Sequence, residues 1–209
     1  MAESVPLQFA PTLTDEDRAR ADYYALLARL YFDGPDAKLL AAIGGAVPIV
    51  AQDGAPGAAL AAGWAQLQAA CRCADAQTLA FEYSNVFIGT GKALVTLYST
   101  HYLEESMKGR ALVRLRERLR ELGLARTGDA GVYEDHIASL CEVMRHLVLE
   151  GSGAAAMQQQ KEFFISYIQP CYQPFSSSVE ACTELVFYKA VGRFSKAFFD
   201  IEAEALSMV

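Results

Sequence analysis

The sequence predicts an all-α, single-domain bundle of several helices over residues 1–209. Three observations predict it. Apolar residues recur at helical spacing along most of the chain. Helix start and stop signals separate these apolar runs from one another. No stretch alternates apolar and polar residues with hairpin turns between such stretches, as the strands of a sheet would.

The composition excludes several classes of protein. The 209 residues are 53% hydrophobic and 21% charged, with a net charge of −7, and a chain of this kind can bury a core without disulfides. An acidic chain is a poor general binder of nucleic acid, whose phosphates attract basic proteins, but it permits a cationic partner. The N-terminus shows no export signal, and the longest apolar stretch (39–51) is short of the roughly 20 residues that span a bilayer. We therefore expect a cytoplasmic protein that does not insert into membranes.

Helix signals are clear in the first half of the chain. Thr14 followed by Asp15, Glu16 and Asp17 is typical of a helix start, because a capping side chain and acids lie at the positive end of the helix dipole. Gly34-Pro35 ends this helix. The next expected elements are two helices within 36–76, broken around 53–57, and a helix over Gln77–Phe87 that ends at Gly89 and Gly91.

The second half continues the helical pattern. A long helix is expected from Ser99 or Thr100 toward Gly123, and we interpret its arginines and glutamates as a solvated face with ion pairs inside the helix. Residues 126–131 are a polar link and the best candidate for a hinge. Three further helices are expected: one with the apolar stripe Ile137, Leu140, Cys141, Met144, Leu147 and Val148, one ending before Pro170, and a last one starting at Ser176–Ser178 with Glu180.

Known catalytic patterns are absent or incomplete. The Gly89–Lys92 loop resembles a phosphate-binding loop, but it lacks the first glycine and the Ser or Thr after the lysine, and it follows a helix instead of a strand. Cys71 and Cys73 have no second Cys or His pair at a zinc-site spacing. We therefore expect no enzyme, no bound metal and no cofactor. A small nucleotide-hydrolysing enzyme is kept as a distant alternative.

Asp135 and His136 are the one acid–histidine pair to consider. Adjacent residues diverge by about 100° around a helix, so the pair does not form a base and its orienting acid. The helical wheel places His136 at the border of the apolar stripe and Asp135 on the side away from it. Taken alone, the pair is therefore interpreted as a helix-starting acid beside a half-buried histidine.

Several segments together resemble a known family. Tyr133-Glu134-Asp135-His136 resembles the Glu-Pro-x-Asp-His motif of the TorD/DmsD family of cytoplasmic chaperones, which assist the maturation of exported molybdenum redox enzymes. The other segments that resemble the family are Glu82–Gly89 (Glu-Tyr-x-x-Leu-Phe-x-Gly), Leu97-Tyr98-Ser99 (a short Tyr and Ser motif), Phe163–Pro170 (Phe-Phe-x-x-His-Leu-x-Pro) and the last helix from Phe187 to Glu202. Val132 and Tyr133 replace the first Glu and the Pro of the Asp-His motif.

The resemblance implies a TorD-like bundle and a partner, the precursor of a molybdenum-containing oxidoreductase. The chaperone would bind the precursor's twin-arginine leader, a cationic start followed by an apolar stretch, until the cofactor is inserted and the enzyme is folded. The implied leader-binding residues are the carboxylates Glu82, Glu134 and Asp135, the apolar or polar Phe87, Leu97, Tyr98, Ser99 and Tyr133, and His136, which would gate the site if its charge changes near neutral pH. Helices would swap across 126–131, giving a monomer or a domain-swapped dimer. The alternative is a NarJ-like assembly chaperone of a membrane-attached nitrate reductase.

Overall fold

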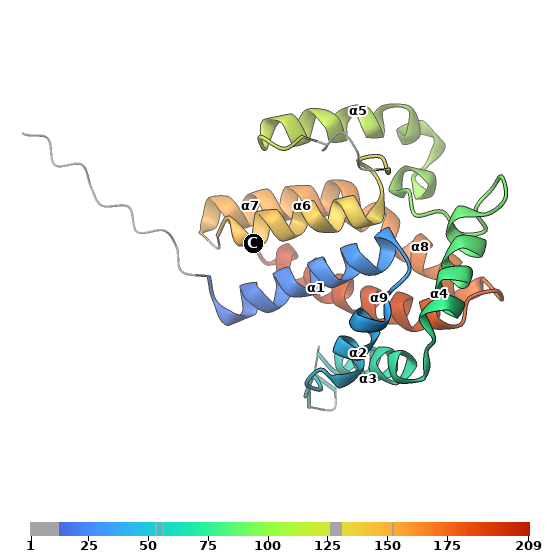
Figure 1. The fold of residues 1–209 in the computed structure, drawn as a ribbon. Coiled ribbons are helices and arrows are strands. Elements are labelled where there is room, and N and C mark those ends of the chain that lie inside the picture. Colours follow the sequence, from blue (N-terminus) through green and yellow to red (C-terminus); the bar gives the residue numbers. More distant parts are fainter. Residues whose placement is uncertain (1–12, 53, 56, 126–130, 152) are drawn as a thin grey trace, which may run out of the picture.

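Helices account for most of the described chain. The computed structural model describes residues 13–52, 54–55, 57–125, 131–151 and 153–209, and Figure 1 shows their arrangement. The α-helices in chain order are α1 (Asp15–Phe32), α2 (Ala37–Gly45), α3 (Ala58–Cys73), α4 (Ala76–Tyr83), α5 (Glu105–Glu121), α6 (Ile137–Leu149), α7 (Ala154–Phe163), α8 (Gln169–Ala181) and α9 (Phe187–Ser207). Shorter elements are the π-helical turns η1 (Ser84–Ile88) and η3 (Phe164–Ile168) and the 3-10 turn η2 (Ser99–Tyr102). These residues contain no strand, so the predicted all-α class is confirmed.

The helices surround one hydrophobic core. α1 packs along α6, and α9 packs against both α3 and α8 (Figure 1). Tyr24, Leu27 and Phe194 have no exposed surface at the centre of this core. α5 lies along the top of Figure 1. Among its described side chains only Leu115 and Leu119 are buried, so it packs sparsely on the rest of the protein. The chain is thus a single all-α domain with one lightly packed helix. No helix of the described ranges combines the length and the apolar content needed to cross a membrane.

Side-chain caps fix where the early helices begin. The Thr14 hydroxyl accepts the Asp17 N–H at 3.0 Å, and the Asp17 carboxylate accepts the Thr14 N–H at 3.3 Å. Such reciprocal bonds satisfy N–H groups that have no acceptor within the helix. Asp36 and Asp75 cap α2 and α4 with single bonds, in which their carboxylates accept the N–H groups of Leu39 and Thr78 at 2.7 and 2.9 Å. The predicted start of the first helix is therefore confirmed.

A buried ionic network joins α1, α7 and α9. Glu202 is 1% exposed and accepts hydrogen bonds from Arg20 Nε at 2.7 Å, Arg20 Nη2 at 2.9 Å and the Tyr24 hydroxyl at 2.8 Å. Arg20 also donates to Gln160 at 2.9 Å and pairs with Asp17 at 3.4 Å. A buried charge is costly unless it is paired and hydrogen-bonded. The network therefore requires these three helices to keep one relative position.

The helix predicted to begin at Ser99 or Thr100 begins later. The residues from Ser99 onward form η2, the backbone is extended at Leu103, and α5 begins at Glu105. The Ser99 N–H donates to the carbonyl of Asp135 at 2.9 Å, a contact made far along the chain. This contact ties η2 to the segment before α6, so the helical run has to restart after η2. A local spacing pattern does not contain that information.

The predicted start of the last helix is wrong. Ser176, Ser177 and Ser178 lie inside α8, where each hydroxyl donates to the carbonyl four residues earlier at 2.7 to 3.0 Å. Serine satisfies its hydroxyl in this way within helices as well as at caps, so the same residues suit both positions. The break falls between α8 and α9, and α9 begins at Phe187.

The predicted hinge at 126–131 lies almost wholly outside the described residues. It stays a prediction, as do the bounds of the domain.

Candidate ligand-binding groove

Two segments that carry predicted site residues meet at the N-terminal end of α6. Tyr98 and His136 form an isolated antiparallel bridge. Beside it, the Ser99 N–H donates to the Asp135 carbonyl at 2.9 Å, and the Leu97 carbonyl accepts the first N–H of α6 at 2.8 Å. The structure thus brings together the Leu97-Tyr98-Ser99 and Asp135-His136 motifs.

Asp135 is held inside this junction. Its side chain is buried, with the residue 4% exposed, and Oδ2 accepts the Thr100 hydroxyl at 2.6 Å. The expectation that Asp135 points away from the apolar stripe is wrong, because α6 begins only at Ile137 and a helical wheel does not apply to the residues before it. The carboxylate holds η2 against the start of α6.

His136 is the N-cap of α6. Its Nδ1 accepts the Ala138 N–H at 3.2 Å, and its ring packs edge-on against Tyr98 with the ring centroids 5.2 Å apart. Burial lowers the pKa of His136 from 6.5 to about 4. The prediction that the charge of His136 changes near neutral pH is therefore wrong for the folded chain. The neutral imidazole serves as a helix cap.

Tyr133 and Glu134 are the more exposed residues of the motif. Tyr133 is 55% exposed, and its ring centroid lies 6.1 Å from that of Tyr98. The Glu134 carboxylate accepts hydrogen bonds from Nε and Nη2 of Arg116, both at 3.1 Å. Arg116 belongs to α5, so this pair joins α5 to the segment before α6. The predicted ion pair inside α5 forms between Arg118 and Glu121 at 3.1 Å, whereas Arg116 pairs outside the helix.

Glu82 and Phe87 lie at a different place, the start of α9. The Glu82 carboxylate accepts the N–H groups of Val186, Phe187 and Tyr188 at 3.2, 3.3 and 3.0 Å. Phe87 is buried, and its ring packs against that of Tyr188 with centroids 4.9 Å apart. A carboxylate at a helix N-terminus satisfies free N–H groups and opposes the helix dipole. The geometry gives both residues a structural role, and their predicted role in ligand binding stays a prediction.

Glu82→Ala is expected to lower the free energy of unfolding by about 2 kcal/mol, since three N–H groups lose their acceptor. Glu82→Gln, which keeps an acceptor oxygen, is expected to cost less. Urea denaturation followed by circular dichroism measures both. Loss of peptide binding at unchanged stability would instead place Glu82 in the binding site.

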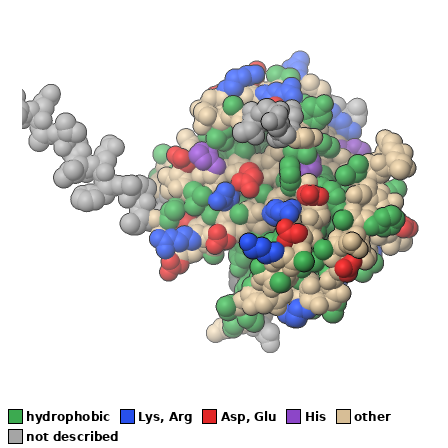
Figure 2. Space-filling model, in the orientation of Figure 1, with side chains coloured by type: hydrophobic (Ala, Val, Ile, Leu, Met, Phe, Trp, Pro, Cys, Tyr) green, Lys and Arg blue, Asp and Glu red, His purple; other side chains and the backbone are tan. Residues whose placement is uncertain are grey.

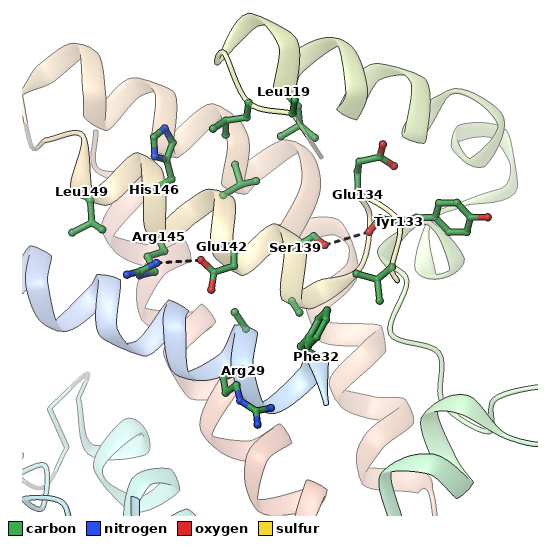
Figure 3. A pocket seen from close by; sticks show the side chains of 16 residues that line it. Arg29, Phe32, Leu119, Tyr133, Glu134, Ser139, Glu142, Arg145, His146 and Leu149 are labelled. Carbon is green, nitrogen blue, oxygen red and sulfur yellow. Dashed lines mark hydrogen bonds and ion pairs between the residues drawn. The ribbon is translucent and has the colours of Figure 1, made fainter. Parts of the chain in front are cut away.

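An open groove of about 630 Å³ lies between α1, α6 and the C-terminal end of α5 (Figure 3). Its apolar lining includes Phe32, Leu119, Leu124, Val132, Val143 and Leu149. Phe32 is 49% exposed and Leu149 is 41% exposed. Figure 3 shows Phe32 on α1 beside the groove, with Glu142, Arg145 and His146 on the facing helix α6. Exposed apolar side chains around a hollow are typical of a binding site.

The charges around the groove are balanced. Glu142 pairs with Arg145 at 3.3 Å, and Arg29 pairs with Asp36 at 3.5 Å. Glu134, which also lines the groove, pairs with Arg116 of α5. In Figure 2, acidic and basic side chains are interspersed with hydrophobic ones on the face drawn. A cationic ligand therefore meets carboxylates that already have counter-ions from the same chain.

The remaining polar candidates form no second site. Burial raises the pKa of the Cys71 thiol to about 11, so it is protonated at neutral pH, and Cys73 is exposed. No group of three His, Cys, Asp or Glu side chains within the described ranges is placed to hold a metal. Gly89 has a φ of 67°, and a Cβ there would collide with the Lys92 carbonyl, so this loop requires glycine for its own turn.

Sequence reasoning missed most residues of the groove. Phe32 and Leu149 lie at the ends of correctly predicted helices, and Glu142 lies on the polar side of α6. One signal was available: Phe32 and Leu149 are large apolar residues outside the stripes that fill the core. That signal marks exposure, but it does not show that the two residues face one groove.

A comparison with known proteins identifies the family. Residues 54–177, more than half of the 209-residue chain, match the model of a family described as nitrate reductase delta subunit. No curated protein matches the chain significantly. The matched range includes α5, α6 and the motifs at their junction. Members of this family are chaperones for nitrate reductase assembly and not catalytic subunits, in agreement with the resemblance to redox-enzyme maturation chaperones. The chain therefore belongs to the nitrate reductase delta subunit family of molybdoenzyme assembly chaperones.

Proposed function

We propose that this protein is a non-enzymatic cytoplasmic chaperone that binds the twin-arginine leader of a molybdenum-containing oxidoreductase precursor. It acts as a monomer or in exchange with a domain-swapped dimer, and it assists cofactor insertion, folding and export of the precursor. The observation that carries the proposal is the groove between α1, α5 and α6, which is open, largely apolar and bordered by carboxylates.

The groove suits both parts of such a leader. The apolar stretch of the leader would pack on Phe32, Leu119 and Leu149, where it removes exposed apolar surface from water. The arginines would approach Glu134 and Glu142. Buried apolar anchors supply most of the affinity of such contacts, and charge pairs at the border supply register and specificity.

The predicted site residues near the groove, which do not include Glu82 and Phe87, divide into two groups in this proposal. Tyr133 and Glu134 are partly exposed and contact the ligand directly. Leu97, Ser99, Asp135 and His136 are buried, and Tyr98 packs on His136. They position the segment that carries Tyr133 and Glu134. We therefore expect substitutions in the buried group to act through the position of this segment.

An assembly chaperone of a membrane-attached nitrate reductase is the second candidate. The family match supports it equally well, because the matching model is that of the nitrate reductase delta subunit. The ligand would then be an N-terminal segment of the catalytic subunit without the arginine pair. The same groove would bind it mainly through its apolar side.

Isothermal titration calorimetry separates the two candidates. The full chain is titrated with synthetic leaders of the host's molybdoenzyme precursors that carry the arginine pair, with the N-terminal peptide of its nitrate reductase catalytic subunit, and with scrambled versions of both. Binding of an Arg-Arg leader supports the first candidate. Binding of the nitrate reductase peptide alone supports the second. If no peptide binds better than its scrambled version, both candidates are contradicted.

Phe32→Ser is expected to weaken binding of the leader about tenfold, because the change removes an aromatic anchor from the groove. Phe81→Ser is the matched control, since Phe81 is 74% exposed on α4 and is not part of the groove lining. Calorimetry gives the affinities, and thermal unfolding shows whether both variants stay folded. Equal affinities of the two variants would place the ligand elsewhere.

A further inference from the structure

We propose that Arg116 occupies, in the free chaperone, the position on Glu134 that an arginine of the bound peptide takes, so that the ligand displaces the chain's own guanidinium. The inference rests on the proposed function and adds to it a specificity for arginine and an internal competitor. It follows from contacts that α5 makes with the motif before α6.

The contact between Arg116 and Glu134 has the geometry of guanidinium recognition. Two nitrogens of Arg116, Nε and Nη2, each donate to a different oxygen of Glu134 at 3.1 Å. Only a planar guanidinium makes this two-point contact, whereas the ammonium of lysine is a point charge. Glu134 in this position is therefore a receptor for an arginine side chain, and one arginine already occupies it.

Arg116 contacts Glu134, which the sequence marks for ligand binding, and it also lies within the field of Asp135. The hydrogen bonds that Arg116 donates to Glu134 are the largest cause of the raised pKa of Arg116, and the charge of Asp135 acts in the same direction. The predicted site for a cationic ligand thus already contacts a cation of the same chain. This arrangement explains why the border of the groove carries carboxylates without being acidic overall.

The position of α5 makes the exchange feasible. Besides the Arg116 pair, α5 is held by the Arg118–Glu162 pair at 3.1 Å and by a hydrogen bond from the Tyr167 hydroxyl to the Arg114 carbonyl at 3.2 Å. The Arg116 side chain is 40% exposed and can turn into solvent, whereas the Glu134 side chain is 13% exposed and needs a counter-ion in its place. A ligand guanidinium can therefore replace Arg116 on Glu134 without unfolding the core.

The test is calorimetry with the full chain and two synthetic peptides. One peptide carries an Arg-Arg pair followed by an apolar stretch, and the other carries Lys-Lys at the same place. Arg116→Gln is expected to bind the Arg-Arg peptide about fivefold more tightly than the wild type, which corresponds to the loss of one competing ion pair. The Lys-Lys peptide is expected to gain less than twofold.

Matched variants identify the cause of any gain. Arg120→Gln removes one positive charge from an exposed position on the same helix, and it is expected to change the affinity less than twofold. In the background of Glu134→Gln, Arg116→Gln is expected to bring no gain, because the receptor is absent. Thermal unfolding of each variant verifies that it is folded.

The outcomes separate the inference from the proposed function. A gain in Arg116→Gln that is absent in Arg120→Gln and in the Glu134→Gln background supports the inference. An equal gain in Arg116→Gln and Arg120→Gln, or no gain in a protein whose wild type binds the leader, overturns the inference and leaves the proposed function intact. If neither the wild type nor Arg116→Gln binds the Arg-Arg peptide, both are overturned.

Discussion

Glu202→Ala is expected to lower the free energy of unfolding by about 3 kcal/mol and the Tm by roughly 10 °C. The reason is the buried network. Glu202 accepts three hydrogen bonds at 2.7 to 2.9 Å, two of them from Arg20, whose side chain is 12% exposed. Without Glu202, Arg20 loses its main counter-ion and the Tyr24 hydroxyl loses its acceptor, and both remain out of water. Calorimetric and urea-induced unfolding measure the loss.

The control for Glu202→Ala is Glu180→Ala. Glu180 pairs with Arg193, but both side chains are about half exposed (51% and 52%), so this change is expected to cost less than about 1 kcal/mol. The double variant Arg20→Met/Glu202→Met is expected to recover most of the loss, since it leaves no unpaired charge. A Glu202→Ala variant as stable as Glu180→Ala would show that the network contributes no net stability.

The second large effect is a dependence of stability on pH that comes from His136. Its pKa is about 4 in the folded chain and about 6.5 in the unfolded chain, so the unfolded state binds the proton more tightly. The contribution is therefore complete above about pH 6.5 and is lost progressively as the pH falls toward about 4, by about 3 kcal/mol in all. Urea denaturation at a series of pH values across this range measures it.

His136→Asn isolates this effect. Asparagine is a good N-cap, so its side-chain oxygen can accept the Ala138 N–H, while the titrating ring is removed. We expect the variant to be less stable than the wild type at neutral pH because packing on Tyr98 is lost, but to lose less stability on acidification. Equal pH slopes in the two proteins would mean that other groups cause the acid sensitivity.

Local signals in the sequence were sufficient for much of the fold. The capping residues of α1 and the apolar stripe of α6 depend on neighbours a few positions away, and both were predicted correctly. The errors arose where distant residues decide the structure, or where the same residues suit two positions in a helix. η2 is tied to Asp135, and the serines of α8 serve equally well inside a helix as at a cap.

The site was less predictable than the fold. The motifs mark two segments that lie close together, Leu97-Tyr98-Ser99 and Asp135-His136. Several of their residues are buried, so they position the site but are not exposed to a ligand. The groove is lined by both Phe32 of α1 and Leu149 of α6, and no local sequence pattern relates these two positions. Arg116 was assigned to a solvated face because charged residues at helical spacing look alike until their partners are known.

The contact between Arg20 and Glu202 also sets an order of events during synthesis. The two residues are 182 positions apart, so α1 leaves the ribosome long before the helix that carries its counter-ion. Closing so long a loop costs entropy and follows the formation of local structure. Because α1 forms one wall of the groove, that wall receives the main counter-ion of Arg20 only after α9 has been released. A nascent chain of this chaperone would then carry an arginine on α1 without its main counter-ion until the last helix has joined the fold.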